Sequence, residues 1–437
     1  MKRSFLPFTF LFITMASHAQ EKVLLDQVIK ASLEKNYDVV LARNNASSKE
    51  TDSQFSFGAY LPQVNATGAL GWSSTNQVLQ FVDITKNKEG KAESNNTNAS
   101  VGLNWTLFDG TKMFATKMRI GAIAKQSELQ LKDQMINTIS ATIINYYNVV
   151  RQKQQLNATK EQMAVNEERV KLADRKLAVG IGAKPELLQA KVDLNAQRAL
   201  VLQQEATIAQ LKEQLNLQTG RSLQPEFDVS DSIEINLNLT LEELLDNIEM
   251  NNYALKASKW NLVIAEKLLY ESRAGLSPIV NLNGAYTYGT TDNTKLLNPF
   301  GSTFIKNEGF TYGLSASFPL LAGLNNRRLI EQSKIGLSRQ HLLYEQQKLT
   351  INTNLKNAFT NYENAKKILL VEEENILLAK ENVTIALEAF KRGVSTFIEL
   401  RTAQQSLSDA YNQLIAARYN AKTSEAELLR LSGKLLQ

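Results

Sequence analysis

The sequence contains two copies of one long pattern, separated by a nearly constant number of residues. In the N-terminal part of each half the offset is 216 residues, and after one shorter loop it becomes 213. Matches at the first offset pair Leu25, Asn36, Tyr37, Pro62, Val64, Asn65 and Gly68 with Leu241, Asn252, Tyr253, Pro278, Val280, Asn281 and Gly284. Matches at the second offset pair Gly110, Gly180, Glu186, Leu187, Ala190 and Gly220 with Gly323, Gly393, Glu399, Leu400, Ala403 and Gly433. A fixed repeat far longer than a solenoid unit predicts two half-structures that combine with each other.

The first 19 residues have the pattern of a secretory signal peptide. A basic start precedes the apolar run Phe5–Met15, and Ser17 and Ala19 supply small side chains before a cleavage point. The alternative, a membrane anchor, is disfavoured because this run is shorter than the ~18–20 residues that span a bilayer. The expected organisation is a signal peptide at 1–19, a first repeat at 20–220 and a second repeat at 221–437.

Composition excludes several classes of protein. The chain of 437 residues has no cysteine, which rules out a disulfide scaffold, a thiolate metal site and a lipid-modified cysteine at the mature N-terminus. Its net charge of +5 is mild and evenly mixed, so nucleic-acid binding is not expected.

Two stretches are expected to be very long helices. Thr111–Ala178 and Leu324–Lys391 contain no proline, and at ~1.5 Å per residue each would be roughly 100 Å long. Their shorter partners, Glu186–Thr219 and Glu399–Ser432, repeat apolar residues every seven positions, which is typical of a coiled coil. These seams are Leu187, Leu194, Val201, Ile208 and Leu215 in the first copy and Leu400, Leu407, Leu414, Ala421 and Leu428 in the second. A companion seam of small residues is Ala403, Ala410 and Ala417, and the second long helix carries an apolar stripe from Leu355 to Phe390.

Four shorter runs alternate with period two and predict β-strands in two hairpins, at about 62–108 and 278–321. Their apolar positions are Val64, Ala66, Gly68, Leu70 and Trp72; Val101, Leu103, Trp105 and Leu107; Val280, Leu282, Gly284, Tyr286 and Tyr288; and Phe310, Tyr312, Leu314, Ala316 and Phe318. A soluble sandwich would alternate as well. The length of the runs, about the 9–11 residues of a membrane strand, and the aromatic residues near their ends favour a transmembrane barrel instead. The aromatic residues expected to face lipid are Trp72, Trp105, Tyr286, Tyr288, Tyr312 and Phe318, and the polar segments Thr85–Asn98 and Asp292–Glu308 are expected to be extracellular loops.

Four strands cannot close a barrel, and a sheet with free edges is not stable in lipid. Three chains would supply twelve strands and six similar helix pairs. The expected fold class is therefore mainly α with membrane β: a long antiparallel coiled-coil α-barrel, plus four strands per chain that contribute to a trimeric 12-stranded transmembrane β-barrel.

Two motifs in duplicate carry a resemblance to a known family. One is the strand-to-helix junction at Leu107–Gly110, weakly repeated at Pro319–Gly323, and the other is the helical turn at Val179–Leu187, repeated at Arg392–Leu400. Together with the leader, strands and seams, they show that the chain resembles the TolC-like outer-membrane efflux proteins over its mature length. The resemblance implies a homotrimeric outer-membrane channel that reaches into the periplasm of a Gram-negative cell. It also implies a periplasmic adaptor protein and an inner-membrane pump of the RND, ABC or MFS type as partners, in efflux or type I secretion.

The two helical turns are the candidate functional site. Gly180 and Gly393 are suited to the positive φ that ends a helix, and Glu186 and Glu399 fall in the first turn of the next helix, where an acid favours the helix dipole. Either the two acids only stabilise the helix starts, or they form a ring of six at the periplasmic mouth. The residues expected at the tip and in adaptor docking are Gly180, Ile181, Gly182, Ala183, Gly393, Val394 and Ser395.

The family resemblance extends to the gating of the tip, with differences. Glu399 matches one acidic position of the family's entrance, whereas the next such position is Thr402. Phe390 and Ser395 stand where the family uses an aromatic hydroxyl and an arginine to hold the copies together, so the family's closed-state contacts are not expected to form in the same way.

No enzymatic motif is present in the sequence. His341 is the single histidine after the signal peptide and is expected to face solvent, and no catalytic residue, metal site or cofactor is predicted. Two functions remain: a passive export channel, or a non-channel periplasmic or surface coiled-coil structural protein. They differ in whether the apolar strand faces lie in lipid or in a protein core.

Overall fold

The computed structural model describes residues 21–220, 227–246, 248–298 and 300–436. The predicted signal peptide at 1–19 lies outside the described residues. The chain forms two compact units, and each takes segments from both sequence repeats. Among the described residues, the helical unit contains those up to Ala42, those between Leu131 and Tyr253 and those from Thr350 on, and the sheet unit contains those between Arg43 and Gln130 and between Ala254 and Leu349.

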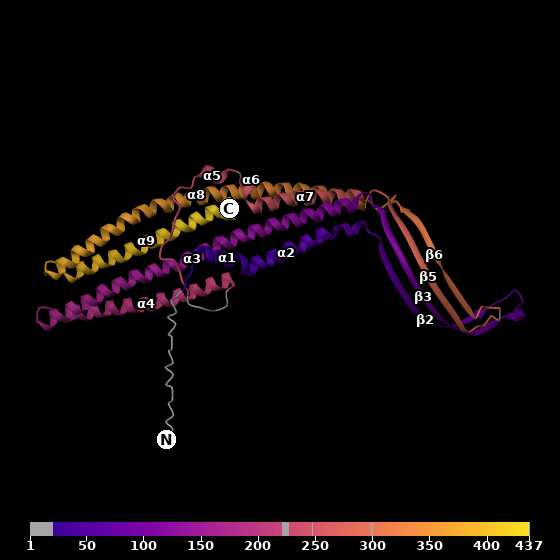
Figure 1. The fold of residues 1–437 in the computed structure, drawn as a ribbon, viewed down its shortest axis with the longest axis horizontal. Helices are drawn as coiled ribbons and strands as arrows, with labels where there is room; N and C mark the ends of the chain where they lie inside the picture. Colours follow the sequence, from indigo (N-terminus) through magenta and orange to yellow (C-terminus); the bar gives the residue numbers. More distant parts are fainter. Residues whose placement is uncertain (1–20, 221–226, 247, 299, 437) are drawn as a thin grey trace, which may run out of the picture. The chain divides into compact units, whose positions relative to one another are not determined.

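Long helices dominate the structure, and their bounds agree closely with the prediction (Figure 1). The longest are α3, Lys112–Ala178, and α8, Asn325–Lys391, with 67 residues each. Their partners α4, Lys184–Thr219, and α9, Phe397–Ser432, have 36 residues each and begin two residues earlier than expected. The shorter helices are α1 at Leu25–Lys35, α2 at Tyr37–Gln54, α5 at Leu241–Leu245, α6 at Ile248–Asn251 and α7 at Tyr253–Ala274, with one-turn helices at Phe55–Tyr60 (η1), Ile84–Lys86 (η2) and Lys434–Leu436 (η3).

The predicted heptad seams form the core between the helices. Both seams are buried except at Ile208 and Leu407, which are partly buried, and the companion alanines are buried as well. Within the helical unit, α8 packs on α9 through Leu369 and Leu414, among others. The sustained seven-residue period therefore produces the coiled-coil packing that it predicts.

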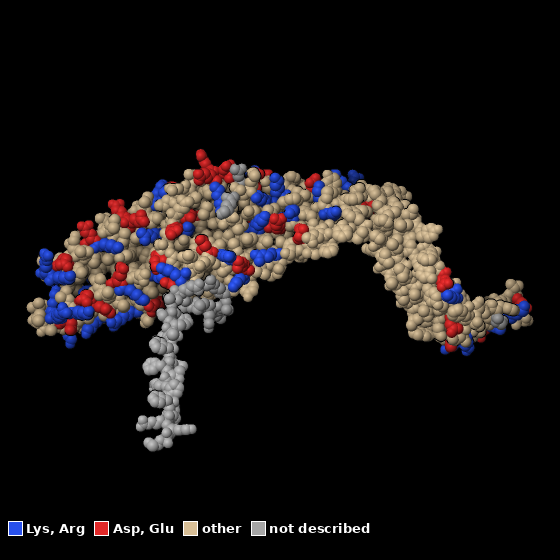
Figure 2. Space-filling view, viewed as in Figure 1, with Lys and Arg blue, Asp and Glu red and all other residues tan. Residues whose placement is uncertain are grey.

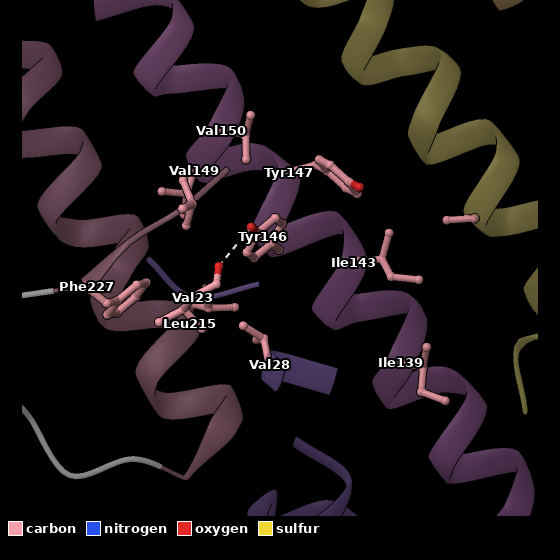
Figure 3. Packing of buried hydrophobic residues seen from close by; sticks show 12 residues of the cluster. Val23, Val28, Ile139, Ile143, Tyr146, Tyr147, Val149, Val150, Leu215 and Phe227 are labelled. Atoms are coloured by element: carbon pink, nitrogen blue, oxygen red, sulfur yellow. Dashed lines mark hydrogen bonds between the residues drawn. The ribbon is translucent and has the colours of Figure 1, made fainter. Parts of the chain in front are cut away.

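A second part of the core lies where the chain start meets the segment between the repeats. The strand β1, Glu21–Lys22, pairs in parallel with β4, Phe227–Asp228. Beneath this pair the Tyr146 hydroxyl donates to the Val23 carbonyl at 3.0 Å, as Figure 3 shows. Nearby, the Lys153 ammonium contacts Asp231 at 2.7 Å, and this hydrogen bond is the largest cause that lowers the pKa of Asp231 to about 2.

The sheet unit contains a four-stranded antiparallel sheet in the order β2-β3-β5-β6. Its strands are β2 at Gln63–Leu79, β3 at Lys88–Phe108, β5 at Ile279–Lys295 and β6 at Phe304–Ser317. Directly opposite residues share a face, and the register aligns Val64 with Leu103, Leu103 with Gly284 and Gly284 with Tyr312. The predicted apolar positions thus fall on one face of the sheet.

The other face of the sheet is polar and internally hydrogen-bonded. The Thr67 and Ser100 hydroxyls lie 2.9 Å apart, and Thr106 donates to the Asn281 side chain at 2.9 Å. Trp105 belongs to the apolar face instead, and its indole donates to the backbone carbonyl of Tyr60 at 2.8 Å.

The strand bounds differ from the prediction in three ways. The strands have 14 to 21 residues instead of 9–11, so most of Thr85–Asn98 and much of Asp292–Glu308 are strand, and the prediction that they are loops was wrong. The β3–β5 register shifts between Thr106 and Phe108, so Leu107 falls at a bulge, and β6 ends at Ser317, one residue before Phe318. The physical reason is that backbone hydrogen bonds continue past the point where apolar alternation stops, since polar side chains on both faces suit a strand in water.

Candidate functional site

The two predicted turns have the same backbone path. Gly180 has φ of 81° and Gly393 has φ of 76°, the left-handed conformation that the sequence predicted. The Ile181 amide donates to the Lys176 carbonyl at 3.0 Å, and in the second copy Val394 donates to Ala389 at 2.9 Å. The duplicated motif therefore builds one structure twice.

Position 182 shows where the copies differ. A Cβ atom on Gly182 would lie 2.7 Å from the Leu177 nitrogen and 2.8 Å from the Lys176 carbonyl carbon. The second copy has Ser395 here, and its amide lies 3.4 Å from the Ala389 carbonyl, compared with 2.9 Å for Gly182 and Lys176. The second turn is thus slightly wider, which makes room for a side chain.

The two acidic residues occupy first helical turns, but only one completes a capping box. Glu399 donates its amide to the Thr396 hydroxyl at 3.3 Å, and its carboxylate accepts from the Thr396 amide at 3.1 Å. The N-cap residue of α4 is Ala183, three residues before Glu186, and its methyl side chain cannot accept a hydrogen bond from the start of the helix. The structural role is thus established for Glu399, while Glu186 has only the favourable position near the helix dipole.

Basic residues share the turns with these acids. Lys176, Lys184, Lys391 and Arg392 all lie within or beside them, and Figure 2 shows lysine and arginine side chains gathered at this end of the helices. Lys391 donates to Glu388 at 2.8 Å, and this hydrogen bond lowers the pKa of Glu388. A ring formed by Glu186 and Glu399 would therefore have lysine and arginine side chains beside it.

Exposed apolar side chains surround the glycines of the turns. Ile181 and Val394, both in the predicted docking set, are among the most exposed large apolar residues of the chain. Val179 and Ile398, 70 % and 72 % exposed, are nearly as exposed and were not in the predicted docking set. The sequence could have identified Val179 and Ile398 as exposed, because they are apolar residues that lie outside the heptad seams.

A buried arginine near the turns was also missed. Arg169 on α3 is 4 % exposed, and its guanidinium forms a salt bridge with Asp193 on α4. It also donates to the Gln404 side chain on α9 at 3.0 Å and lies 4.9 Å from the centre of the Phe397 ring. Asp193 in turn lies 3.4 Å from Arg401 on α9. We call Arg169, Asp193, Phe397, Arg401 and Gln404 the arginine cluster; it joins the helix pair of the first copy to that of the second.

Phe390 and Thr402, two of the positions that differ from the family that the chain resembles, have structural roles. Phe390 is buried, with the Lys176 ammonium 4.0 Å from the centre of its ring. Thr402 donates to the Ile398 carbonyl at 3.0 Å within its own helix. Neither side chain forms a described hydrogen bond between the two copies, and the arginine cluster makes that connection instead.

The predicted lipid-facing aromatic residues lie on or next to the sheet. Trp72 and Tyr312 are highly exposed, and the Tyr286 and Phe310 rings lie 4.6 Å apart on the same face. Trp105 is partly covered by its contact with Tyr60. No charged residue occurs in the sheet stretches 63–79, 94–108, 279–291 and 309–317, and Figure 2 shows a matching uncharged band.

Other predicted features concern His341, metal binding and membrane-spanning helices. His341 is exposed, as predicted. The described residues contain no group of three or more His, Cys, Asp or Glu side chains placed to hold a metal ion. Among the helices in the described ranges, none combines the length and apolar character needed to cross a membrane.

An exposed apolar sheet face together with long coiled-coil helices defines an outer-membrane channel-type protein, and sequence comparison supports this class. The profile of the family described as outer membrane efflux protein matches residues 28–221 and 244–434, and the chain belongs to this family. It is 22% identical to outer membrane protein TolC of Vibrio cholerae over 400 residues, covering 91% of this chain and 87% of that protein. It is 23% identical to outer membrane efflux protein BepC of Brucella suis over 372 residues, covering 82% and 77%.

Solved structures share the fold. The CmeC outer membrane channel of Campylobacter jejuni superposes with a TM-score of 0.76 at 17% identity, covering 94% of this chain and 85% of that one. The outer-membrane channel OprN gives a TM-score of 0.73 at 17% identity, covering 94% and 90%. The family membership places the protein in the outer membrane of a Gram-negative cell, reaching into the periplasm.

Proposed function

We propose that this protein is the passive outer-membrane exit channel of a tripartite efflux system. One observation carries the proposal: the sheet has an exposed apolar, charge-free face, as a membrane barrel requires and a coiled-coil structural protein does not. The alternative of a soluble sandwich would need a second layer over this face. The names of the relatives, among them outer membrane efflux protein BepC, agree with an efflux role.

The proposed assembly is a homotrimer with a twelve-stranded barrel. The described sheet ends in two edge strands, β2 with 17 residues and β6 with 14. Unpaired backbone groups on such edges cost several kcal/mol each in lipid. Pairing β6 of one copy with β2 of the next removes the edges, and three copies give twelve strands, within the range of known barrels.

The helical turns are proposed as the periplasmic mouth and the docking surface for an adaptor protein. The exposed Ile181 and Val394, beside the small residues Gly180, Gly393 and Ser395, offer apolar contacts without steric obstruction to an incoming helical hairpin. The proposed partners are this adaptor and an inner-membrane pump of the RND, ABC or MFS type, which supplies the energy. In this proposal the arginine cluster holds the mouth closed.

The test is a mass measurement combined with a conductance measurement. Native mass spectrometry of the detergent-purified protein is expected to give three chains, and planar bilayers containing it should show ion-conducting steps. A monomer that retains its full β content, or a trimer with no conductance after the arginine cluster is removed, would contradict the proposal.

A further inference from the structure

A cavity of about 470 Å³ lies between helices of the two sequence repeats, close to the turns. Residues of α3, α8 and α9 line it, and beside it the Lys176 ammonium of α3 lies 4.0 Å from the centre of the Phe390 ring of α8. This volume falls within the range of small-molecule sites in proteins. A ligand held here would therefore touch both sequence repeats at once.

Apolar side chains from all three helices form much of the cavity wall. These residues are Ala164, Val165, Leu172, Leu387, Phe390 and Leu400. Phe390 and Leu400 are buried, and Leu172 and Leu387 are partly buried. Such a wall suits an apolar ligand body, because contact with it removes apolar surface from water.

The charged side chains of the cavity are mainly basic. The described residues that line it include one acid, Glu168, and four cations, Arg169, Lys171, Arg175 and Lys391. Lys171 pairs with Glu168 at 2.7 Å, and Lys391 pairs with Glu388 at 2.8 Å. An excess of positive charge beside an apolar wall favours a ligand that carries an anionic group.

The arginine cluster adds positive charge behind this wall. Its one carboxylate, Asp193, is shared by two guanidinium groups, those of Arg169 and Arg401. Arg169 lines the cavity, and its buried Nε–H has no acceptor among the described residues. Charges interact more strongly away from water, so this incompletely balanced cation strengthens the attraction of the cavity for an anion.

The basic character of the cavity belongs to the first repeat alone. At the offset of 213 residues, Arg169, Lys171 and Arg175 correspond to Asn382, Thr384 and Glu388. The apolar position between them is kept, since Leu172 corresponds to Ile385. Both repeats build the same pair of helices, so this pair does not by itself require basic residues here.

We propose that the cavity binds a small amphipathic carboxylate. Its apolar body would lie against Leu172, Leu387 and Phe390, and its carboxylate would lie at the rim beside Arg175 and Lys391. Both of these cations are exposed, so the anionic end of the ligand stays partly hydrated while the apolar end is covered. Guanidinium and carboxylate groups favour each other through charge-assisted hydrogen bonds.

The bound ligand would act on the mouth, and this step rests on the proposed function. The ligand contacts α3 of one repeat and α8 of the other, so it stabilises the arrangement in which these helices lie together. The arginine cluster, proposed to hold the mouth closed, shares Arg169 with the cavity. Ligand binding should therefore keep the mouth closed for a larger fraction of time.

Calorimetric titration of the intact protein in lipid nanodiscs with naphthoate, measured against empty nanodiscs, tests the site. Naphthoate should bind, whereas naphthol and naphthylmethylammonium, with neutral and cationic ends on the same rings, should bind more weakly. Arg175→Gln should weaken binding about tenfold, as expected for one hydrogen bond between charged groups. Ala164→Trp, at an exposed position of the wall, should block the cavity. Lys160→Gln is the matched control, because Lys160 is an exposed cation of α3 that pairs with Glu205 at 2.9 Å and does not line the cavity.

Conductance in planar bilayers separates this inference from the proposed function. Naphthoate should reduce the open fraction of the wild type and leave that of Ala164→Trp unchanged. No binding, equal binding of naphthoate and naphthol, or binding that survives both Arg175→Gln and Ala164→Trp would overturn the site, even in a protein that conducts. Binding without an effect on conductance would overturn the action on the mouth. A protein that binds naphthoate but never conducts, even as the Asp193→Asn variant, would overturn the proposed function and leave the site standing.

Discussion

Replacing Asp193 with asparagine would leave a buried guanidinium without its carboxylate. Arg169 is 4 % exposed, and after the change it keeps only the Gln404 hydrogen bond and the Phe397 ring. Removing one partner of a buried ion pair costs about 3–5 kcal/mol, and the Phe397 ring contact does not reduce this cost because it is present before and after the change. We therefore expect Asp193→Asn to lower the free energy of unfolding of the helical unit by about 3–5 kcal/mol.

Replacing Arg169 in place of Asp193 should lower the free energy of unfolding by less. In Arg169→Met the carboxylate of Asp193 keeps Arg401 at 3.4 Å and is closer to water, with 16 % of its side chain exposed. The expected loss is about 1.5–3 kcal/mol, the range of a hydrogen bond to a charged group. The double variant Arg169→Met with Asp193→Asn should be more stable than Asp193→Asn alone, because no buried charge remains unpaired.

The assay is urea unfolding followed by circular dichroism, with single-channel conductance measured on the same samples. Glu168→Gln is the matched control, since Glu168 forms an exposed pair with Lys171 on the same helix and should leave stability unchanged. Under the proposed function Asp193→Asn should also raise conductance. An Asp193→Asn variant as stable as the control, or a double variant whose losses simply add, would refute the reasoning.

Further predictions concern the sheet, the mouth and the core. Leu103→Arg, on the apolar face, should cost about 2–4 kcal/mol in folding into vesicles if it lies near the bilayer midplane, and brominated lipid should quench Trp72; an unquenched Trp72 would contradict a lipid-facing sheet. Glu399→Gln preserves a capping box with Thr396 and removes only the charge, so reduced cation preference at unchanged stability would support an acidic mouth, and unchanged selectivity would leave capping as its role. Burial raises the pKa of Tyr147 to about 12, so the stability that the neutral phenol contributes is complete below about pH 10 and is lost as the pH rises through 12. The absorbance difference between wild type and Tyr147→Phe should therefore titrate near pH 12. Titration near pH 10 would contradict the burial of Tyr147.

The helices could be predicted from the sequence because their signals are redundant. A seven-residue period across Leu187 to Leu215, the absence of proline and the agreement of two copies all indicate the same structure. Turn positions followed from glycine for a similar reason, since few residues tolerate the positive φ found at Gly180 and Gly393.

The strand ends could not be predicted in this way. The alternation of apolar residues indicates only where one face of the sheet meets an apolar environment. The backbone hydrogen bonds between strands continue beyond that region, from Asn95 to Lys88 on β3. The arginine cluster was equally inaccessible, because Arg169 lies 24 residues from Asp193 and 235 from Gln404. Only the packing of two distant helix pairs brings these side chains together.

The arginine cluster connects the two copies inside each chain, and its geometry predicts how the helical part moves. The contact inside each chain is centred near the tip on a buried, hydrogen-bonded guanidinium, whose energy depends strongly on geometry. Because a small rotation would break this contact, we expect the arginine cluster to act as the lock of the proposed mouth. Under the proposed trimer, substitution at Asp193 should then open the mouth without separating the three chains, so conductance should rise while the native mass stays unchanged.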